Sequence, residues 1–331
     1  MGTLCEITAY APVDGEARTE EAIEAAFAEL KRIDAALSNW KPDSQLMRMN
    51  AVAAAAPAAG RRPQAAVGQE LFERVRTALQ LARETHGRFD PTVGPLVRAW
   101  GFLPPGTHPL PRDAAIAAAR ERVGWQKVIL NAETRTVQFA VPNMEIDLGG
   151  IAKGYAAQST ARVLREHGIR AALVNLGSSS MAAIGSPPGE SGWPVVIRDP
   201  RDTETPVMQV LLQDGESLAT SGTYEKTTGR GRNRHSHILN PATGAAVGGA
   251  VSVTILMDDA ETADALTKPF FLMPRPPAED WAKLLARFPK ASVILMAARG
   301  ERLQRRTGGL HPERFLALEG ASERRHAAQT H

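Results

Sequence analysis

The stretch that decides the fold is Asp147-Leu148-Gly149-Gly150-Ile151-Ala152-Lys153-Gly154-Tyr155. It follows an apolar strand end at residues 144–146 and leads into a helical pattern over residues 156–164. A strand, a glycine-rich turn and a helix N-terminus together form an anion-binding arrangement, because glycines let the backbone approach a ligand and unpaired N–H groups favour phosphate. Lys153 adds a positive charge, and Asp147 adds a carboxylate that could hold a ribose, an amide or a metal.

Motif spacing leaves two interpretations of this stretch. It lacks the G-x-x-x-x-G-K-[ST] spacing of a Walker A loop and the G-x-G-x-x-G spacing of a dinucleotide-binding turn. One interpretation is a phosphate site at the helix N-terminus. The other is a tight strand-to-helix connection with a lysine that faces solvent.

Further blocks rich in glycine, proline and aspartate lie on both sides of this stretch. The first is Met1-Gly2-Thr3, at the start of the chain. The others are LSNWKPDS (37–44), GRFDPTVGPL (87–96), NLG (175–177), WPVVIRDP (193–200), ATSGTYE (219–225), HILNPATG (237–244) and ADALT (263–267).

In this order and spacing, the blocks resemble the ApbE family, the FAD:protein FMN transferases. The resemblance runs from Met1 to about Met273. It implies an α+β fold of two interleaved lobes, with mixed or antiparallel sheets, flanking helices and a flavin site between the lobes. It also implies an enzyme that takes FAD as substrate, with Mg²⁺ assisting, and attaches FMN to a threonine of an acceptor protein.

Composition excludes several other classes of protein. A chain of 331 residues can bury one large core or two modest ones. Its formal net charge of +3 is small for this length and predicts no nucleic-acid partner. The single cysteine, Cys5, excludes an internal disulfide and a cysteine-based zinc site. No apolar run is long enough to predict a transmembrane segment.

The start of the sequence bears on localisation. It has no charged segment followed by an apolar core and a cleavage site, so the sequence as given predicts a cytoplasmic protein. Many proteins of the family that it resembles are exported, often as lipoproteins. A missing N-terminal leader would therefore make the protein periplasmic or anchored to the inner membrane.

Hydrophobic periodicity predicts helices and strands in alternation. A helix is expected over residues 19–37, with Thr19 as its N-cap. The prolines and glycine of residues 51–67 favour a loop or short strand instead of a helix. Further helices are predicted over residues 69–86, 113–123, 260–272 and 278–287, and strands over 127–130, 137–140, 172–175, 181–184, 195–197, 208–212, 251–256 and 291–296.

The domain organisation follows from these elements. The family-like domain is predicted to span residues 1–300, and residues 301–331 form a C-terminal extension. That extension is charged and has little periodicity, and roughly its last dozen residues are expected to be disordered.

An aromatic and two turns are the expected flavin-nucleotide ligands. Trp40 offers a large face on which an isoalloxazine ring can stack, although a surface lid over the core is the alternative. Arg88-Phe89-Asp90 matches a flavin-contacting segment of the family, and Asp90-Pro91 is also an ordinary helix start. The resemblance implies the remaining nucleotide contacts, which are Met1, Asp147, Lys153 and Ile238.

Among the histidines, His237 is the best candidate for acid–base catalysis. It is predicted at a strand end that enters a turn, and an unperturbed imidazole titrates near pH 6.5. A hydrogen-bonded structural histidine is the alternative. The preceding basic stretch 226–235 is interpreted as a mobile loop that meets the acceptor protein or the phosphates.

The expected metal site departs from the family pattern. The resemblance implies Mg²⁺ bound by the Gly150 carbonyl, Asp264 and Thr267, but position 268 is a lysine where a threonine is usual. Because residues i and i+4 share a helix face, Lys268 would pair with Asp264 and take the place of the cation. The alternative is that Lys268 swings outward and leaves an ordinary metal site.

Three functions remain open on the sequence alone. The leading one is Mg²⁺-assisted transfer of FMN from FAD to a threonine hydroxyl, with release of AMP. The second is FAD pyrophosphatase activity, in which water replaces the threonine. The third is a flavin-binding protein with weak or no transferase activity, because Lys268 replaces a metal-ligand threonine.

Overall fold

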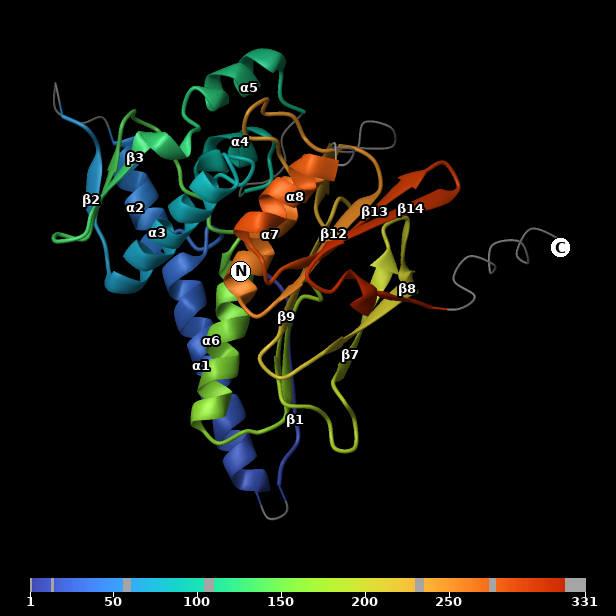
Figure 1. Cartoon of the computed structure of the whole chain (residues 1–331). Helices are drawn as coiled ribbons and strands as arrows, with labels where there is room; N and C mark the ends of the chain where they lie inside the picture. The colour runs from blue at the N-terminus through green and yellow to red at the C-terminus, as the bar shows by residue number, and fades with distance from the viewer. Residues whose placement is uncertain are drawn as a thin grey trace.

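The structure is a computed structural model of the chain (Figure 1). Met1, one of the expected flavin contacts, lies outside the residues that the structure describes, and so do the last dozen residues of the sequence. The described residues are 2–12, 15–55, 61–103, 110–229, 235–273 and 278–318.

An antiparallel sheet of seven strands forms the centre of the described chain. Its strand order places β6, β9 and β12 in the middle, with β1 and β14 at the edges. All residues of β6 and β12 are buried, which explains why both are mostly apolar, with only small hydroxyl residues among them. In spatial order the strands are β1 (Cys5–Ala9), β5 (Ala172–Leu176), β6 (Ser180–Ile184), β9 (Ser217–Gly222), β12 (Val251–Met257), β13 (Ser292–Arg299) and β14 (Arg302–Gly309).

Three helices cover one face of this sheet (Figure 1). They are α1 (Glu16–Leu37), α6 (Ala152–Glu166) and α7 (Ala260–Phe271), and α6 lies between the other two. Gly154 permits the close approach of α6 to α7, since a Cβ at this position would lie 1.9 Å from the Ala260 carbonyl oxygen. This packing brings the start of α6 against the side of α7.

A second, three-stranded antiparallel sheet covers the opposite face. It consists of β7 (Trp193–Asp199), β8 (Asp202–Leu212) and β15 (Leu316–Ala317). Residues 302–317 therefore add one strand to each of these two sheets. The side chains between the sheets form a separate apolar cluster, which includes Met181, Val195, Val210, Leu256 and Ile294.

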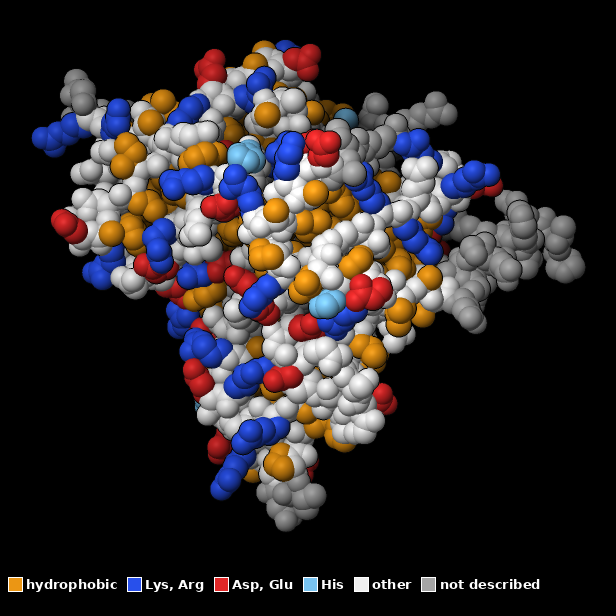
Figure 2. All heavy atoms as spheres, viewed as in Figure 1, with side chains coloured by type: hydrophobic (Ala, Val, Ile, Leu, Met, Phe, Trp, Pro, Cys, Tyr) orange, Lys and Arg blue, Asp and Glu red, His pale blue; other side chains and the backbone are white. Residues whose placement is uncertain are grey.

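Most of the remaining elements form the helical part of the molecule, above the sheet in Figure 1. On the face seen in Figure 2, basic and acidic side chains are interspersed over this part and over the helices below it. No helix within the described ranges is long and apolar enough to cross a membrane. The further elements are α2 (Gln45–Ala54), β2 (Gln64–Ala66), α3 (Gln69–Glu84), α4 (Gly94–Ala99), α5 (Asp113–Arg120), β3 (Val128–Asn131), β4 (Thr136–Phe139), β10 (Thr227–Thr228), β11 (His235–Ser236) and α8 (Ala278–Arg287).

The predicted fold class, α+β with antiparallel sheets and flanking helices, is confirmed. Three local predictions were wrong. Residues 144–146 do not form the end of a strand, because the Ile146 N–H and carbonyl are hydrogen-bonded to the Asn50 side chain instead of to a neighbouring strand. Thr19 is not an N-cap, because α1 begins at Glu16 and the Thr19 hydroxyl donates to the Gly15 carbonyl inside the helix. Residues 51–54 are helical instead of looped, because Ser44 caps α2 by accepting a hydrogen bond from the Met47 N–H, and the helix ends before the first proline.

Candidate functional site

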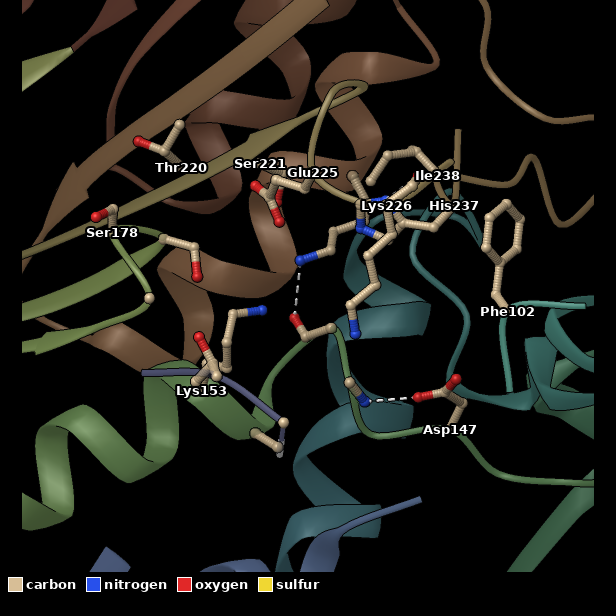
Figure 3. A pocket seen from close by; sticks show the side chains of 18 of the residues that line it. Phe102, Asp147, Lys153, Ser178, Thr220, Ser221, Glu225, Lys226, His237 and Ile238 are labelled. Atoms are coloured by element: carbon tan, nitrogen blue, oxygen red, sulfur yellow. Dashed lines mark hydrogen bonds between the residues drawn. The ribbon is translucent and has the colours of Figure 1, made fainter. Parts of the chain in front are cut away.

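A cavity of about 800 Å³ lies where the central sheet meets the helical part of the molecule. Segments far apart in the sequence line it: the loops at 38–40 and 88–90, the glycine-rich turn, β9 and the residues flanking β10 and β11. In Figure 3, Ser178 and Thr220 lie on one side of the cavity, and Phe102, His237 and Ile238 lie on the other. The glycine-rich turn identified from the sequence therefore opens into a cavity large enough for a nucleotide-sized ligand.

The Lys268 ammonium is fixed at the wall of this cavity. It donates to the Asp264 carboxylate at 2.7 Å, to the Asp264 backbone carbonyl at 2.7 Å and to the Gly150 carbonyl at 3.2 Å. An ammonium has three N–H donors, so these three oxygens account for all of them. A Cβ at Gly150 would lie 2.9 Å from the Phe89 ring and 3.4 Å from Lys268 Cε, so glycine keeps this carbonyl within reach.

Asp264 is buried and has both carboxylate oxygens engaged. One oxygen accepts from Lys268, and the other accepts from the Gly154 N–H in the first turn of α6, at 3.2 Å. Burial by itself raises the pKa of this carboxyl, but the charges of Lys153 and Lys268 outweigh burial and hold the pKa below its ordinary value. Asp264 is therefore an anion that offsets part of the charge of two lysines and is stabilised by the positive N-terminus of α6.

The residues present do not fit a divalent cation. The Lys268 ammonium already bridges Gly150 and Asp264, the two groups implied as metal ligands. The third, Thr267, donates its hydroxyl hydrogen to the Asp264 carbonyl at 2.8 Å and lies 2.9 Å from the Ser221 hydroxyl. Within the described ranges, no group of three or more His, Cys, Asp or Glu side chains could hold a metal ion. In this structure the Lys268 ammonium lies between Gly150 and Asp264, as in the alternative in which lysine takes the place of the cation.

Lys153 supplies a second positive charge to the cavity. It projects from the first turn of α6, and the Asp264 carboxylate raises its pKa by more than burial lowers it. Lys153 thus stays charged at the N-terminus of α6, where the positive end of the helix dipole also favours an anion. The solvent-facing alternative is excluded for this lysine, since its side chain lines the cavity (Figure 3).

Trp40 lies at the mouth of the cavity with 39% of its surface exposed. The Lys226 ammonium lies over its ring, 4.5 Å from the ring centroid. Burial and the neighbouring Lys153 lower the pKa of Lys226. The indole thus offers an aromatic face to the cavity, and a cation covers that face in this structure.

The turn at residues 88–90 lines the cavity, but Asp90 is already engaged in the local fold. Its carboxylate accepts from the Thr92 N–H at 2.8 Å and from the Trp125 N–H at 3.0 Å, and burial raises its pKa. The Asp90 side chain therefore caps the start of a short helix, which is the alternative that the sequence allowed. Arg88 and Phe89 line the cavity beside it.

Asp147 holds the glycine-rich turn in place. Its carboxylate accepts from the Gly149 N–H at 2.7 Å (Figure 3), and the Asn39 side chain also donates to it. Burial raises its pKa, and Glu145 adds to that rise. Asp147 therefore ties the turn to the loop that carries Trp40.

His237 lies beside Lys226 and Phe102 at one side of the cavity. Its Nδ1 lies 3.3 Å from the Lys226 carbonyl oxygen, so Nδ1 carries the hydrogen and Nε2 is left as a proton acceptor. Burial, followed by the charges of Lys153 and Lys268, lowers the pKa of this imidazole to about 3. His237 is therefore neutral at physiological pH.

Two charged residues of the cavity had no role in the sequence prediction. Glu225 accepts from the Gly222 N–H at 3.0 Å, and burial raises its pKa despite the opposing effect of Lys153 and Lys268. Lys226 falls in the basic stretch that was interpreted as a mobile loop. Glu225 could have been predicted, because it ends the block ATSGTYE. The position of Lys226 in the cavity could not, because its basic neighbours in the sequence favoured an exposed loop.

The cavity is a candidate enzyme site for a nucleotide with several phosphates. It combines an aromatic face, a helix N-terminus, two lysines and a neutral histidine. A family model described as the ApbE family matches residues 1–295. The chain belongs to the ApbE family.

Individual relatives agree with this assignment. A Klebsiella pneumoniae (strain 342) protein named FAD:protein FMN transferase is 36% identical over 80% of this chain and 74% of its own length. A Treponema pallidum (strain Nichols) protein of the same name is 32% identical over 89% of this chain and 82% of its own.

Solved structures give the same result for the fold. The Thermotoga maritima ApbE protein has a TM-score of 0.75 at 28% identity, covering 92% of this chain and 96% of its own. The Pseudomonas stutzeri flavinyl transferase ApbE has a TM-score of 0.76 at 27% identity, covering 93% and 92%.

Proposed function

We propose that this protein transfers FMN from FAD to a threonine hydroxyl of an acceptor protein and releases AMP. The observation that carries the proposal is the single cavity that joins Trp40, the lysine pair Lys153 and Lys268, and His237. The names of the curated relatives support transfer of FMN from FAD to a protein.

Each part of FAD has a chemically complementary group among the residues that line the cavity. The isoalloxazine ring stacks on Trp40, where aromatic contact and burial favour a flat ring. The pyrophosphate lies at the glycine-rich turn, beside the α6 N-terminus and Lys153. Arg88, Phe89 and Ile238 line the walls around the nucleotide. Binding in this orientation places the phosphorus atoms near both lysines.

The transfer step requires a base, a nucleophile and charge stabilisation. Nε2 of His237 takes the proton of the threonine hydroxyl, whose oxygen attacks the phosphorus on the FMN side. A new threonine–phosphorus ester bond forms, and the bond to the bridging oxygen breaks, so AMP leaves with that oxygen. Lys153 and Lys268 stabilise the negative charge that develops during this displacement.

The low pKa of His237 is compatible with this role. Burial is the first cause of the lowered pKa, followed by Lys153 and Lys268, and a bound pyrophosphate carries negative charge that opposes the effect of the two lysines. The imidazole then becomes a stronger base once FAD is bound. Without nucleotide the imidazole is neutral at physiological pH.

A second candidate function is supported by Lys268 itself. Because this lysine occupies the place implied for a divalent cation, the chain could bind FAD, or hydrolyse it with water, without efficient transfer to a protein. In the first case FAD stays intact. In the second, AMP and free FMN appear together.

One experiment separates these functions. Purified protein is incubated with FAD and each of a set of threonine-bearing proteins from the same genome, in EDTA and in Mg²⁺. AMP is measured by chromatography, and covalent flavin is measured by fluorescence of denatured protein bands. Transfer predicts AMP together with a fluorescent acceptor band. AMP without such a band supports hydrolysis, and neither signal despite FAD binding supports a flavin-binding protein.

A further inference from the structure

We propose that the Lys268 ammonium is a built-in cation that replaces a divalent metal ion in the phosphate site of this protein. FAD binding then requires no divalent cation, and truncation of Lys268 opens a cation site between Gly150 and Asp264. The inference rests on the proposed function in one respect, which is that the bound anion is the pyrophosphate of FAD.

The ligands of the ammonium are those of a hard cation. Carboxylate and backbone carbonyl oxygens are the groups that Mg²⁺ prefers in proteins. Lys268 contacts three such oxygens, two from Asp264 and one from Gly150. A metal ion bound by the Gly150 carbonyl and the Asp264 carboxylate would have to displace the lysine from its hydrogen bonds to both groups. The ammonium and a metal ion therefore compete for one site.

The helix geometry keeps Lys268 in this position. Asp264 and Lys268 are one turn apart on α7 and share a face, so their ion pair forms within the helix. Thr267 is directed instead toward Ser221 on β9, where their hydroxyl oxygens lie 2.9 Å apart. The hydrogen bond from Lys268 to the Gly150 carbonyl also connects α7 to the glycine-rich turn, although the two residues are 118 positions apart in the sequence.

The carboxylates nearest Lys268 already have cationic partners without a metal. Lys153 and Lys268 face the carboxylates of Asp264 and Glu225. A divalent ion added to this group would lie beside two ammonium ions and would lose the Asp264 oxygen that Lys268 uses. A single fixed positive charge can still neutralise phosphate, although it lacks the octahedral coordination of Mg²⁺.

The test compares the wild-type protein with Lys268→Thr in FAD titration calorimetry, each in EDTA and in millimolar Mg²⁺. The wild-type Kd should differ by less than about twofold between the two conditions. Lys268→Thr should bind FAD at least about tenfold more weakly in EDTA, and Mg²⁺ should restore most of the loss. Lys290→Thr, which removes a surface lysine paired with Asp258, is the matched control and should behave like the wild type.

Manganese titration followed by electron paramagnetic resonance reports the cation site without reference to FAD. Lys268→Thr should bind one Mn²⁺ ion, and the double variant Lys268→Thr/Asp264→Asn should lose that ion. Stoichiometric Mn²⁺ binding to the wild type through Asp264, or loss of wild-type FAD binding in EDTA, would overturn the proposal.

The manganese arm also keeps this inference separate from the proposed function. If Lys268→Thr does not fold, the wild-type measurements still decide the proposal. If the wild type binds FAD equally with and without Mg²⁺ but transfers nothing, the proposed function fails and the built-in cation stands.

Discussion

Replacement of Trp40 by alanine tests the position of the isoalloxazine ring. Trp40 exposes 39% of its surface, and about 100 Å² of a roughly 250 Å² side chain is therefore available for a ligand to cover. At about 25 cal/mol per Å², full coverage is worth about 2.5 kcal/mol. A flavin on the face that Lys226 covers must displace its cation–π contact, at a cost of about 0.5–1 kcal/mol. The net loss for Trp40→Ala is about 1.5–2 kcal/mol, a Kd at least about tenfold weaker.

Titration calorimetry and quenching of flavin fluorescence both measure this change. Trp40→Phe keeps a smaller aromatic face and should lose less affinity than Trp40→Ala. Lys226→Met removes the competing cation and should bind FAD at least as tightly as the wild type, if the flavin takes that face. An unchanged Kd in Trp40→Ala would refute the stacking position and leave Trp40 as a surface lid.

Three further predictions follow from His237 and from the helix packing. His237→Gln should bind FAD like the wild type but transfer FMN roughly 10²–10⁴-fold more slowly, and wild-type single-turnover rates would make this histidine structural. The folded pKa of His237 is about 3 and its ordinary value is 6.5, so only the unfolded chain gains this proton between those pH values. Its contribution therefore lowers the free energy of unfolding as pH falls from 6.5 toward 3, and urea titrations of His237→Gln should show a smaller loss than the wild type. Gly154→Ala should destabilise the protein by about 1–3 kcal/mol, because its Cβ would overlap the Ala260 carbonyl, whereas Gly248→Ala, with nothing within 4 Å of its Cβ, should change the unfolding midpoint little.

Local pattern predicted much of the fold, and its failures have physical causes. The helix at residues 69–84 and the hairpin of β3 and β4 follow from periodicity within each segment. The strand β14 was not predicted, because it lies at a sheet edge and its arginine-rich sequence carries no apolar run. The helix α2 was missed because alanines before a proline were assigned to the following loop.

The candidate site shows the same division between local and tertiary information. The pairing of Asp264 with Lys268 follows from helical spacing and was expected from the sequence. The contact of Lys268 with Gly150, by contrast, depends on how α7 packs against α6, which no local pattern specifies. The position of Lys226 also depends on tertiary packing. Its basic neighbours in the sequence favoured a loop, but in the structure its ammonium lies over the Trp40 ring.

The central claim is that this cavity joins FMN to a threonine through a phosphoester bond. The most direct measurement is tandem mass spectrometry of an acceptor protein after incubation with FAD and this protein in EDTA. The account predicts one FMN phosphoester on a threonine of the acceptor, together with an equal amount of AMP, and a rate of modification roughly 10²–10⁴-fold lower when His237→Gln replaces the wild type. An acceptor that stays unmodified while the protein binds FAD, in EDTA and in Mg²⁺ alike, would contradict it.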